Sequence, residues 1–329
     1  MKLSVIIPMY NAASTIDRCL QSVLGLEEPD LEILVVDDGS TDEGKNVCEK
    51  RFQKDPRGTV IGQANAGPSA ARNRGISASE GKYLMFLDAD DYVNTESLKK
   101  MLERLDIEEN IDILIGKAAH FQEGGETWEE DCVLDEELIS HADGEQAYGM
   151  LSRNTGLFLW APWRGIYRRT LFENPALRFP EHMALGEDLV TIPSLYQRAK
   201  AVRVWNGAFY CYQVGQEKSL SKKKNLKQLK SCLGAIEMWY QRFQEEKHDP
   251  VFEEILKEQM ADIYWGLLSY PAYMERKEVR EALGLLKEDQ WILDSLEPSK
   301  GAMQAQVKRF GLKTYCRLKR MKVLLRRGD

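Results

Sequence analysis

The chain has 329 residues, of which 43% are hydrophobic and 29% charged, and its formal net charge is −7. This balance excludes disordered, collagen-like and low-complexity proteins, and the length suffices for about two domains with cores of their own. The charge is unevenly distributed, because residues 1–215 carry a net −13 and residues 216–329 a net +6. Two regions of opposite charge indicate two different tasks.

Neither a membrane-spanning helix nor a secretion signal is evident in the sequence. The apolar runs at 5–9 and 83–87 are far shorter than the ~20 residues that a spanning helix needs. The start of the chain leads into a strand-like run without the apolar core of a signal peptide. Six widely spaced cysteines without a C-x-x-C pair favour reduced thiols over disulfides or a zinc site. We therefore expect a cytoplasmic protein.

Strand patterns dominate the first part of the chain. Short and nearly continuous apolar runs are typical of strands buried on both faces of a parallel sheet. Such runs occur at 3–8, 31–36, 82–87 and 111–115.

Helix patterns lie between these runs. Apolar residues recur with helical spacing from Ile16 onward, and Ser14 or Thr15 is placed to cap the start. A second helix is expected after Asp42, and a third over 68–79, where Pro68 suits the first helical position. The alternation predicts an α/β fold with a doubly wound, mostly parallel central sheet, whose ligands bind beyond the carboxyl ends of the strands.

The remainder of the chain changes character twice. Residues 118–152 contain ten acidic and no basic residues, which we interpret as a solvated excursion from the sheet. Further strands are expected at 160–167 and 201–212, on either side of a helix over 187–198. From there on the pattern is helical, which predicts two domains, 1–220 and 221–329.

Carboxylates follow two of the predicted strands directly. Asp37 and Asp38 come after the second strand, and Asp88 and Asp90 after the third. Clustered carboxylates repel one another, so a divalent cation or a hydrogen-bonding ligand would offset the cost. In extended chain Asp88 and Asp90 would point the same way, which suits Mg²⁺ or Mn²⁺ shared with a diphosphate. A helix cap and a turn, with Asp91 or Asn94 as the capping residue, is the alternative.

The segment 65–75 opens the third predicted helix with small residues. Its free backbone N–H groups, together with Arg72 and Arg74, would favour an anionic ligand near the helix start. The alternative is a surface helix whose arginines are only solvated.

These motifs resemble those of family 2 inverting glycosyltransferases with the glycosyltransferase A fold. The resemblance rests on four ordered segments, at 5–11, 35–42, 65–75 and the Asp-x-Asp motif at 88–90. It covers about residues 3–220, so the C-terminal helical extension inherits nothing from it.

The resemblance also implies roles for individual residues. The nucleotide would be bound by Pro8, Tyr10, Asp37, Asp38, Asn65, Arg72 and Asp88. Asp90, with Asp88, would bind Mn²⁺ or Mg²⁺. Asp188, in the Glu-Asp pair that opens a predicted helix, would be the catalytic base, with Glu187 as the rival. A loop at 219–221 would close over the diphosphate.

The function implied is transfer of one sugar from a UDP-sugar donor to a saccharide or lipid-linked acceptor. The Q-x-x-R-W motif of processive members is absent from the sequence. The alternatives are a glycan-binding module without catalysis and a sugar-phosphate nucleotidyltransferase. Trp160, Trp163 and His182 are candidates for the acceptor side, although core packing explains both tryptophans equally well.

The C-terminus is strongly basic. Residues 303–329 contain nine basic residues and one acidic residue, and Val307, Phe310, Leu318, Met321 and Leu325 fall near one helical face. Such a helix over 303–327 fits peripheral contact with an anionic membrane surface, at the inner face of the cytoplasmic membrane. Packing against the same chain or a second subunit is the alternative, which leaves a homo-oligomer open. Nucleic acid is not expected as a partner.

Overall fold

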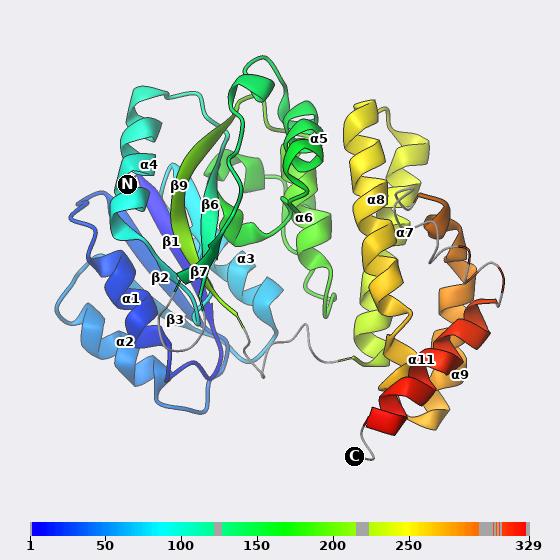
Figure 1. Ribbon diagram of the computed structural model, residues 1–329. Coiled ribbons are helices and arrows are strands. Elements are labelled where there is room, and N and C mark those ends of the chain that lie inside the picture. Colours follow the sequence, from blue (N-terminus) through cyan, green and yellow to red (C-terminus); the bar gives the residue numbers. More distant parts are fainter. Residues whose placement is uncertain are drawn as a thin grey trace. The chain divides into compact units, whose positions relative to one another are not determined.

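The computed structural model describes residues 2–121, 127–214 and 224–295, and in the C-terminal segment residues 305, 307, 309 and 311–326 (Figure 1). The chain forms two compact units. The first, here called the sheet unit, comprises Met1–His182 and Glu187–Gln216. The second, here called the helical unit, comprises Met183–Gly186 and Glu217–Asp329.

A mixed sheet is the centre of the sheet unit. In the described residues it has nine strands in the order β3-β2-β1-β4-β8-β6-β9-β5, with β7 paired to β6. The strands are β1 Leu3–Met9, β2 Leu31–Asp37, β3 Gly58–Gly62, β4 Tyr83–Phe86, β5 Tyr92–Val93, β6 Ile113–Phe121, β7 Thr127–Glu130, β8 Gly165–Arg168 and β9 Val202–Gln213. Strands β3, β2, β1 and β4 pair in parallel, as do β6 and β9. Strands β5, β7 and β8 add antiparallel pairings.

Helices cover both faces of this sheet. They are α1 Ile16–Leu24, α2 Gly44–Phe52, α3 Pro68–Ala78, α4 Thr95–Ile107, α5 Gly144–Thr155 and α6 Glu187–Tyr196. The apolar faces of α1 and α4 share one buried cluster with Leu3, Val5 and Ile7 of β1. On the opposite face, a Cβ on Gly75 of α3 would lie 2.4 Å from Ile6, so only glycine permits this close approach. The predicted α/β class with a largely parallel central sheet is confirmed.

The element predictions differ from the structure at several points. The strand expected from 111 begins at Ile113, and the run 160–167 is a strand only from Gly165, because Pro162 opens a short 3₁₀ helix and lacks an amide donor. Strands β3, β5 and β7 were missed because they are short and weakly apolar. Thr15 stands at the start of α1, but its side chain makes no capping hydrogen bond.

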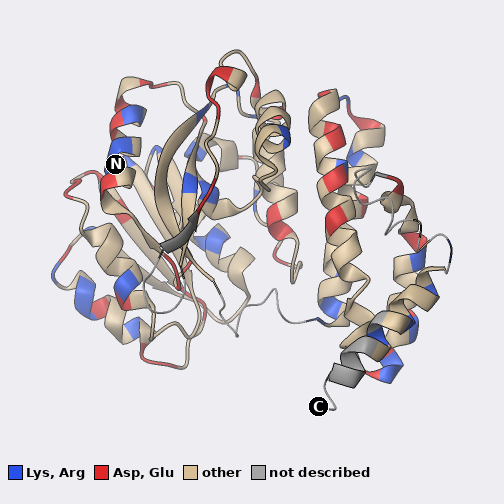
Figure 2. Ribbon diagram, in the orientation of Figure 1, with Lys and Arg blue, Asp and Glu red and all other residues tan. Residues whose placement is uncertain are grey.

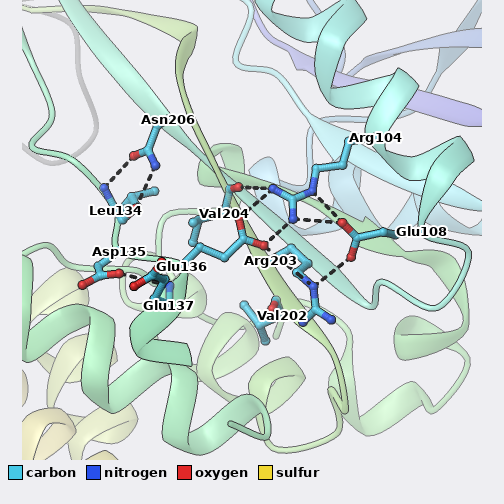
Figure 3. A network of polar contacts seen from close by, with 10 residues as sticks. All are labelled: Arg104, Glu108, Leu134, Asp135, Glu136, Glu137, Val202, Arg203, Val204 and Asn206. Carbon is cyan, nitrogen blue, oxygen red and sulfur yellow. Dashed lines mark hydrogen bonds and ion pairs between the residues drawn. The ribbon is translucent and has the colours of Figure 1, made fainter. Parts of the chain in front are cut away.

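The acidic segment is more than a solvated excursion. The side chain of Asp131 is 4% exposed; it accepts the amide of Ala118 at 2.8 Å and pairs with Arg164 at 2.5 Å. Further along, Glu136 joins Arg104, Glu108 and Arg203 in a network that ties the segment to α4 and β9 (Figure 3).

We call Arg104, Glu108, Glu136 and Arg203 the α4–β9 cluster. Close to it, Asn206 accepts the amide of Leu134 at 2.7 Å and donates to its carbonyl oxygen at 2.8 Å (Figure 3). The negative charge of this segment is therefore partly compensated within the sheet unit.

The helical unit is built from α7 Leu226–Glu245, α8 Pro250–Leu267, α9 Arg276–Glu288 and α11 Leu312–Arg326. Trp239, Phe252 and Tyr264 are fully buried in it. Within this unit the hydroxyl oxygen of Ser231 on α7 accepts the amides of Ala184 and Leu185, at 2.9 and 3.3 Å. No helix among the described residues is long and apolar enough to cross a membrane.

The C-terminal helix α11 presents a different face to its own unit than the one predicted. Leu312 and Cys316 are buried, and Arg320 donates to the carbonyl oxygens of Pro271 at 2.6 Å and Met274 at 3.2 Å.

The face predicted as apolar is therefore divided. Val307 is buried, whereas Leu318 is 44% and Met321 52% exposed. The helix breaks at Gly311, whose φ is +77°, so a single face cannot continue through it. Phe310 and the side chain of Leu325 lie outside the described residues. Figure 2 shows the basic residues gathered on α11.

Candidate active site

The loops that follow β1, β2 and β4 begin side by side at one edge of the sheet. Strands β1 and β2 stay in register as far as Met9 and Asp37, and the amide of Asp38 donates to the carbonyl oxygen of Met9 at 2.8 Å. On the other side of β1, the amide of Leu87 donates to Ile6 at 3.0 Å. This edge is where open α/β sheets bind ligands.

Asn11 joins the first two loops. Its side-chain oxygen accepts the backbone amide of Thr41 at 2.8 Å, and its backbone amide donates to the hydroxyl oxygen of Ser40 at 2.9 Å. Asn11 has a positive φ of 51°, a conformation that asparagine tolerates better than most residues. Sequence reasoning did not single it out, although this tolerance is a usable signal. Next to it, the side chain of Tyr10 is 53% exposed.

The two aspartates after β2 differ in what their carboxylates do. Asp38 is buried and accepts from Gln63, Ala66 and Gly67, each at 2.8 Å. Its carboxylate therefore organises the loop before α3 and is committed to these contacts. Asp37 is also buried and accepts the amide of Ser40 at 3.1 Å.

Asn65 and Gly39 lie where these loops approach each other. Gly39 has a φ of +73°, and a Cβ there would lie 3.0 Å from the amide nitrogen of Asn65. Asn65 itself is exposed, and Pro8 is partly exposed at the end of β1. Five of the seven residues expected to bind the nucleotide thus lie at the ends of β1 and β2 or in the loop before α3; the other two are Arg72 in α3 and Asp88 after β4.

Arg72 of α3 is the central cation of the site. It is 6% exposed, and its guanidinium contacts Asp188 at 3.2 Å, Glu187 at 3.3 Å and Asp88 at 3.4 Å. Burial by itself lowers the pKa of Arg72, but the three carboxylates outweigh burial and raise the pKa. The solvated alternative is therefore wrong for Arg72, whereas Arg74 is exposed.

Glu187 and Asp188 lie in the first turn of α6, where a helix favours negative charge. Burial raises the pKa of Asp188 well above its usual range, and Glu187 and Asp88 raise it further, while Arg72 lowers it. The side chain of Asp188 is 23% exposed and that of Glu187 10%. A carboxylate of raised pKa that remains accessible has the properties of a general base.

The loop after β4 is not extended as predicted. Ala89 and Asp90 form a turn, closed by the amide of Asp91 donating to the carbonyl oxygen of Asp88 at 3.0 Å. The geometric argument from strand alternation was therefore wrong. Burial, and then the neighbouring carboxylate of Asp88, raise the pKa of Asp90, while Arg18 lowers it.

Of the two residues considered as helix caps, Asn94 is the one that caps α4, and Asp91 has another role. Asn94 caps α4 by accepting the amide of Ser97 at 3.0 Å. Asp91 is buried and accepts from Tyr210 and Gln213. Asp91 was not among the predicted site residues, because its partners lie more than a hundred residues away.

The donor set at this loop fits a hard divalent cation only in part. In the portion of the chain that the structure describes, no group of three or more His, Cys, Asp and Glu residues could hold an ion. Asp88 and Asp90 supply two carboxylates. Mg²⁺ is commonly held by one or two carboxylates, with substrate phosphates and water completing its shell, so two suffice when a diphosphate is present.

The remaining candidates occupy different surroundings. The ring of Trp163 stacks on Tyr210 and Tyr212, and that of Trp160 lies 5.7 Å from Phe158. His182 is exposed. The loop expected at 219–221 lies outside the described residues.

The fold is the glycosyltransferase A fold, which the solved structure of TarS shares. A family model described as glycosyl transferase family 2 matches residues 4–174. The chain therefore belongs to glycosyl transferase family 2.

Individual proteins resemble the chain to different extents. The uncharacterized glycosyltransferase EpsJ of Bacillus subtilis is 32% identical over 211 residues, which are 64% of this chain and 60% of EpsJ. TarS of Staphylococcus aureus, a poly(ribitol-phosphate) beta-N-acetylglucosaminyltransferase, is 29% identical over 227 residues, 66% of this chain and 36% of TarS. The chain spans about half the length of the curated relatives it matches.

Two solved structures share the fold. TarS 1–349 in complex with UDP-GlcNAc aligns with a TM-score of 0.68 at 21% identity, covering 98% of this chain and 89% of that one. The mannosyltransferase PcManGT of Pyrobaculum calidifontis, in complex with GDP-Man and Mn²⁺, aligns with a TM-score of 0.56 at 16% identity, covering 98% and 86%.

Proposed function

We propose that the protein is a metal-dependent inverting glycosyltransferase that moves one sugar from a UDP-sugar to a hydroxyl of a saccharide or lipid-linked saccharide at the cytoplasmic face of the membrane. The observation that carries the proposal is Arg72, which contacts both Asp88 of the strand-end loop and Asp188 at the start of α6. It joins the residues that would hold the donor to the residue that would activate the acceptor. Family membership and the nucleotide-sugar complexes of TarS and PcManGT support this assignment.

The reaction is a single displacement at the anomeric carbon. Asp188 accepts the proton of the acceptor hydroxyl while the oxygen of that hydroxyl attacks the anomeric carbon. The nucleoside diphosphate leaves from the opposite face, which inverts the configuration at this carbon. An ordinary aspartate, with a pKa of about 3.9, is a weak base for this task. The burial that raises the pKa of Asp188 makes its carboxylate a stronger base, and Arg72, which lowers this pKa, favours the ionised form.

Asp88 and Asp90 would hold Mn²⁺ or Mg²⁺ together with the diphosphate. The chemistry that such a cation supplies when bound is neutralisation of the negative charge on the leaving group. Arg72 of α3 contacts Asp88 of the same loop and adds a positive charge there. Its planar guanidinium, with several N–H donors, suits phosphate oxygens as well as carboxylates.

The test is binding followed by turnover. Nucleotide sugars are screened by thermal shift with Mn²⁺, since a ligand of the native state raises the melting temperature. UDP-sugars, with UDP-GlcNAc included, are expected to stabilise the protein most. Release of UDP in the presence of an acceptor then distinguishes an enzyme from a glycan-binding module, and the Asp90→Ala variant should lose the Mn²⁺-dependent part of the stabilisation. Stabilisation by no nucleotide sugar would contradict the proposal.

The peripheral membrane contact forms part of the same proposal. Leu318 and Met321 are exposed on α11, on a helix that also exposes Lys313 and Arg317. Exposed apolar side chains among basic ones suit the surface of an anionic bilayer. Replacing Leu318 and Met321 by aspartate should abolish co-sedimentation with phosphatidylglycerol vesicles. Unchanged co-sedimentation would refute the proposed membrane contact.

A further inference from the structure

The strand-end loop 88–91 is held from a distant part of the chain. The hydroxyl of Tyr210 on β9 donates to the carboxylate of Asp91 at 2.7 Å, and the same oxygen accepts the amide of Asp88 at 3.2 Å. One side-chain atom thus connects both ends of the turn that carries Asp88 and Asp90. The amide of Gln213 supplies the second donor to Asp91, at 2.7 Å.

The ring of Tyr210 is itself fixed in place. The indole of Trp163 stacks on it with centroids 4.6 Å apart and an interplanar angle of 17°. Tyr210 is fully buried, and Val93 of the short strand β5 pairs with it across the sheet. A buried ring between a stacked indole and a paired strand has little freedom, so the position of its hydroxyl is defined by packing.

Arg18 fastens the same loop from α1. Its guanidinium donates to the carbonyl oxygen of Asp90 at 2.7 Å and to the side chain of Gln213 at 2.5 Å. It also lies over the rings of Tyr92 and Phe121, 5.0 and 4.9 Å from their centroids. The turn is therefore attached to the end of β9 by side chains on both sides.

We propose that Tyr210 is a positioning residue for the cation and diphosphate of the donor, acting through the turn Asp88–Asp91. Its hydroxyl sets the geometry of the turn that carries Asp88 and Asp90, and Asp91 serves the turn rather than the ligand. Carboxylates that bind a small cation must be held to within a fraction of an ångström, which a turn alone does not achieve. This inference rests on the proposed function, since it assumes a cation at this loop.

Tyr212 offers a matched control. It lies two residues further along β9, and its ring also stacks on Trp163, at 5.6 Å and 23°. Among the described residues its hydroxyl makes no hydrogen bond, unlike that of Tyr210. Tyr210→Phe and Tyr212→Phe therefore remove the same atom from neighbouring stacked rings, and only the first removal affects the turn.

The experiment measures UDP binding by isothermal titration calorimetry to the full chain, with Mn²⁺ and with EDTA. Tyr210→Phe is expected to reduce the Mn²⁺-dependent gain in UDP affinity about tenfold, because the turn loses its link between Asp88 and Asp91. Tyr212→Phe should stay within twofold of the original protein. Circular dichroism melting shows whether each variant is folded. A general loss of stability would lower the UDP affinity measured with Mn²⁺ and the UDP affinity measured with EDTA by the same factor.

The outcomes separate the two proposals. If the unmodified protein binds UDP equally with Mn²⁺ and EDTA, the cation at the loop is refuted, and this inference with it. If Mn²⁺ strengthens binding and Tyr210→Phe retains the whole gain, only the positioning role is refuted. Should Tyr210→Phe fail to fold, Asp91→Asn takes its place, since it keeps the shape of Asp91 but loses one of its two acceptor oxygens. An unchanged Mn²⁺-dependent gain in that variant also refutes the inference.

Discussion

Two clusters of arginines and carboxylates lie in the sheet unit, and they are built differently. The cluster in the candidate active site, here called the active-site cluster, sets a single Arg72 against Asp88, Glu187 and Asp188, at 3.2 to 3.4 Å. In the α4–β9 cluster, Arg104 and Arg203 balance Glu108 and Glu136, and most of the contacts are shorter (Figure 3). The first therefore carries an excess of negative charge and the second carries none.

The pKa values follow the same division. Arg203 and Arg104 outweigh the burial of Glu108 and lower its pKa, whereas burial prevails at Asp188 and raises its pKa. A balanced and half-exposed network holds a loop in place. An unbalanced and buried one is costly unless a ligand or a proton supplies the missing positive charge, and such perturbed groups are common at functional sites.

The largest effect is expected for the carboxylate that the active-site cluster leaves accessible. Asp188→Asn should reduce sugar transfer about 10³-fold, since general-base catalysis contributes roughly 10²–10⁴. The affinity for the donor, measured by calorimetry, should change little. Glu187→Gln is the matched control, and a larger loss of turnover in that variant would assign the base to Glu187 instead.

A smaller effect is expected from removing the cation of the same cluster. Arg72→Gln should slow transfer about 10²-fold, as for the loss of one preorganised donor to a transition state. Because Arg72 lowers the pKa of Asp188, its removal raises that pKa further.

The pH dependence of kcat tests this change in the pKa of Asp188. Because the proposed base Asp188 must be ionised to accept a proton, the acidic limb of the profile should move to higher pH in Arg72→Gln. Arg72→Lys, which keeps the charge, should move the limb less. An acidic limb at the same pH in the unmodified protein, Arg72→Gln and Arg72→Lys would show that Arg72 does not affect the pKa of Asp188.

The smallest effect is expected in the α4–β9 cluster. Glu136→Gln should lower the free energy of unfolding by about 0.2–1 kcal/mol, the usual range for an exposed ion pair. The variant should transfer sugar at the normal rate. Its exposed neighbour Glu137 provides the control, and Glu137→Gln should change neither quantity in urea unfolding and UDP-release assays. Loss of activity in Glu136→Gln at unchanged stability would remove the distinction between the two clusters.

Local patterns were sufficient for much of the fold and part of the site. The continuous apolar runs predicted β1, β2 and β4, and the aspartates at the ends of β2 and β4 lie at the expected edge of the sheet. A strand that is buried on both faces can be identified from its own residues, since burial selects β-branched and aliphatic side chains at every position. The short strand β5 carries no such signal, and Pro162 changed the course of the chain inside a run that reads as apolar.

The face of α11 shows a second limit. Helical periodicity placed Val307 and Leu318 on one apolar face, but Leu318 is exposed and Cys316 is buried in the structure. Periodicity describes one uninterrupted helix, and the positive φ of Gly311 breaks the alignment between the segments on either side.

The sequence by itself determined which residue types stand at the ends of the strands, and hence the family. Only the tertiary structure decided which of those residues lie together. Arg72 reaches Asp188 across 116 positions of chain, and Tyr210 reaches Asp91 across 119. The physical reason is that backbone pattern follows from local sterics and burial, whereas the partner of a charged side chain depends on which distant segment the fold brings within about 3 Å of it.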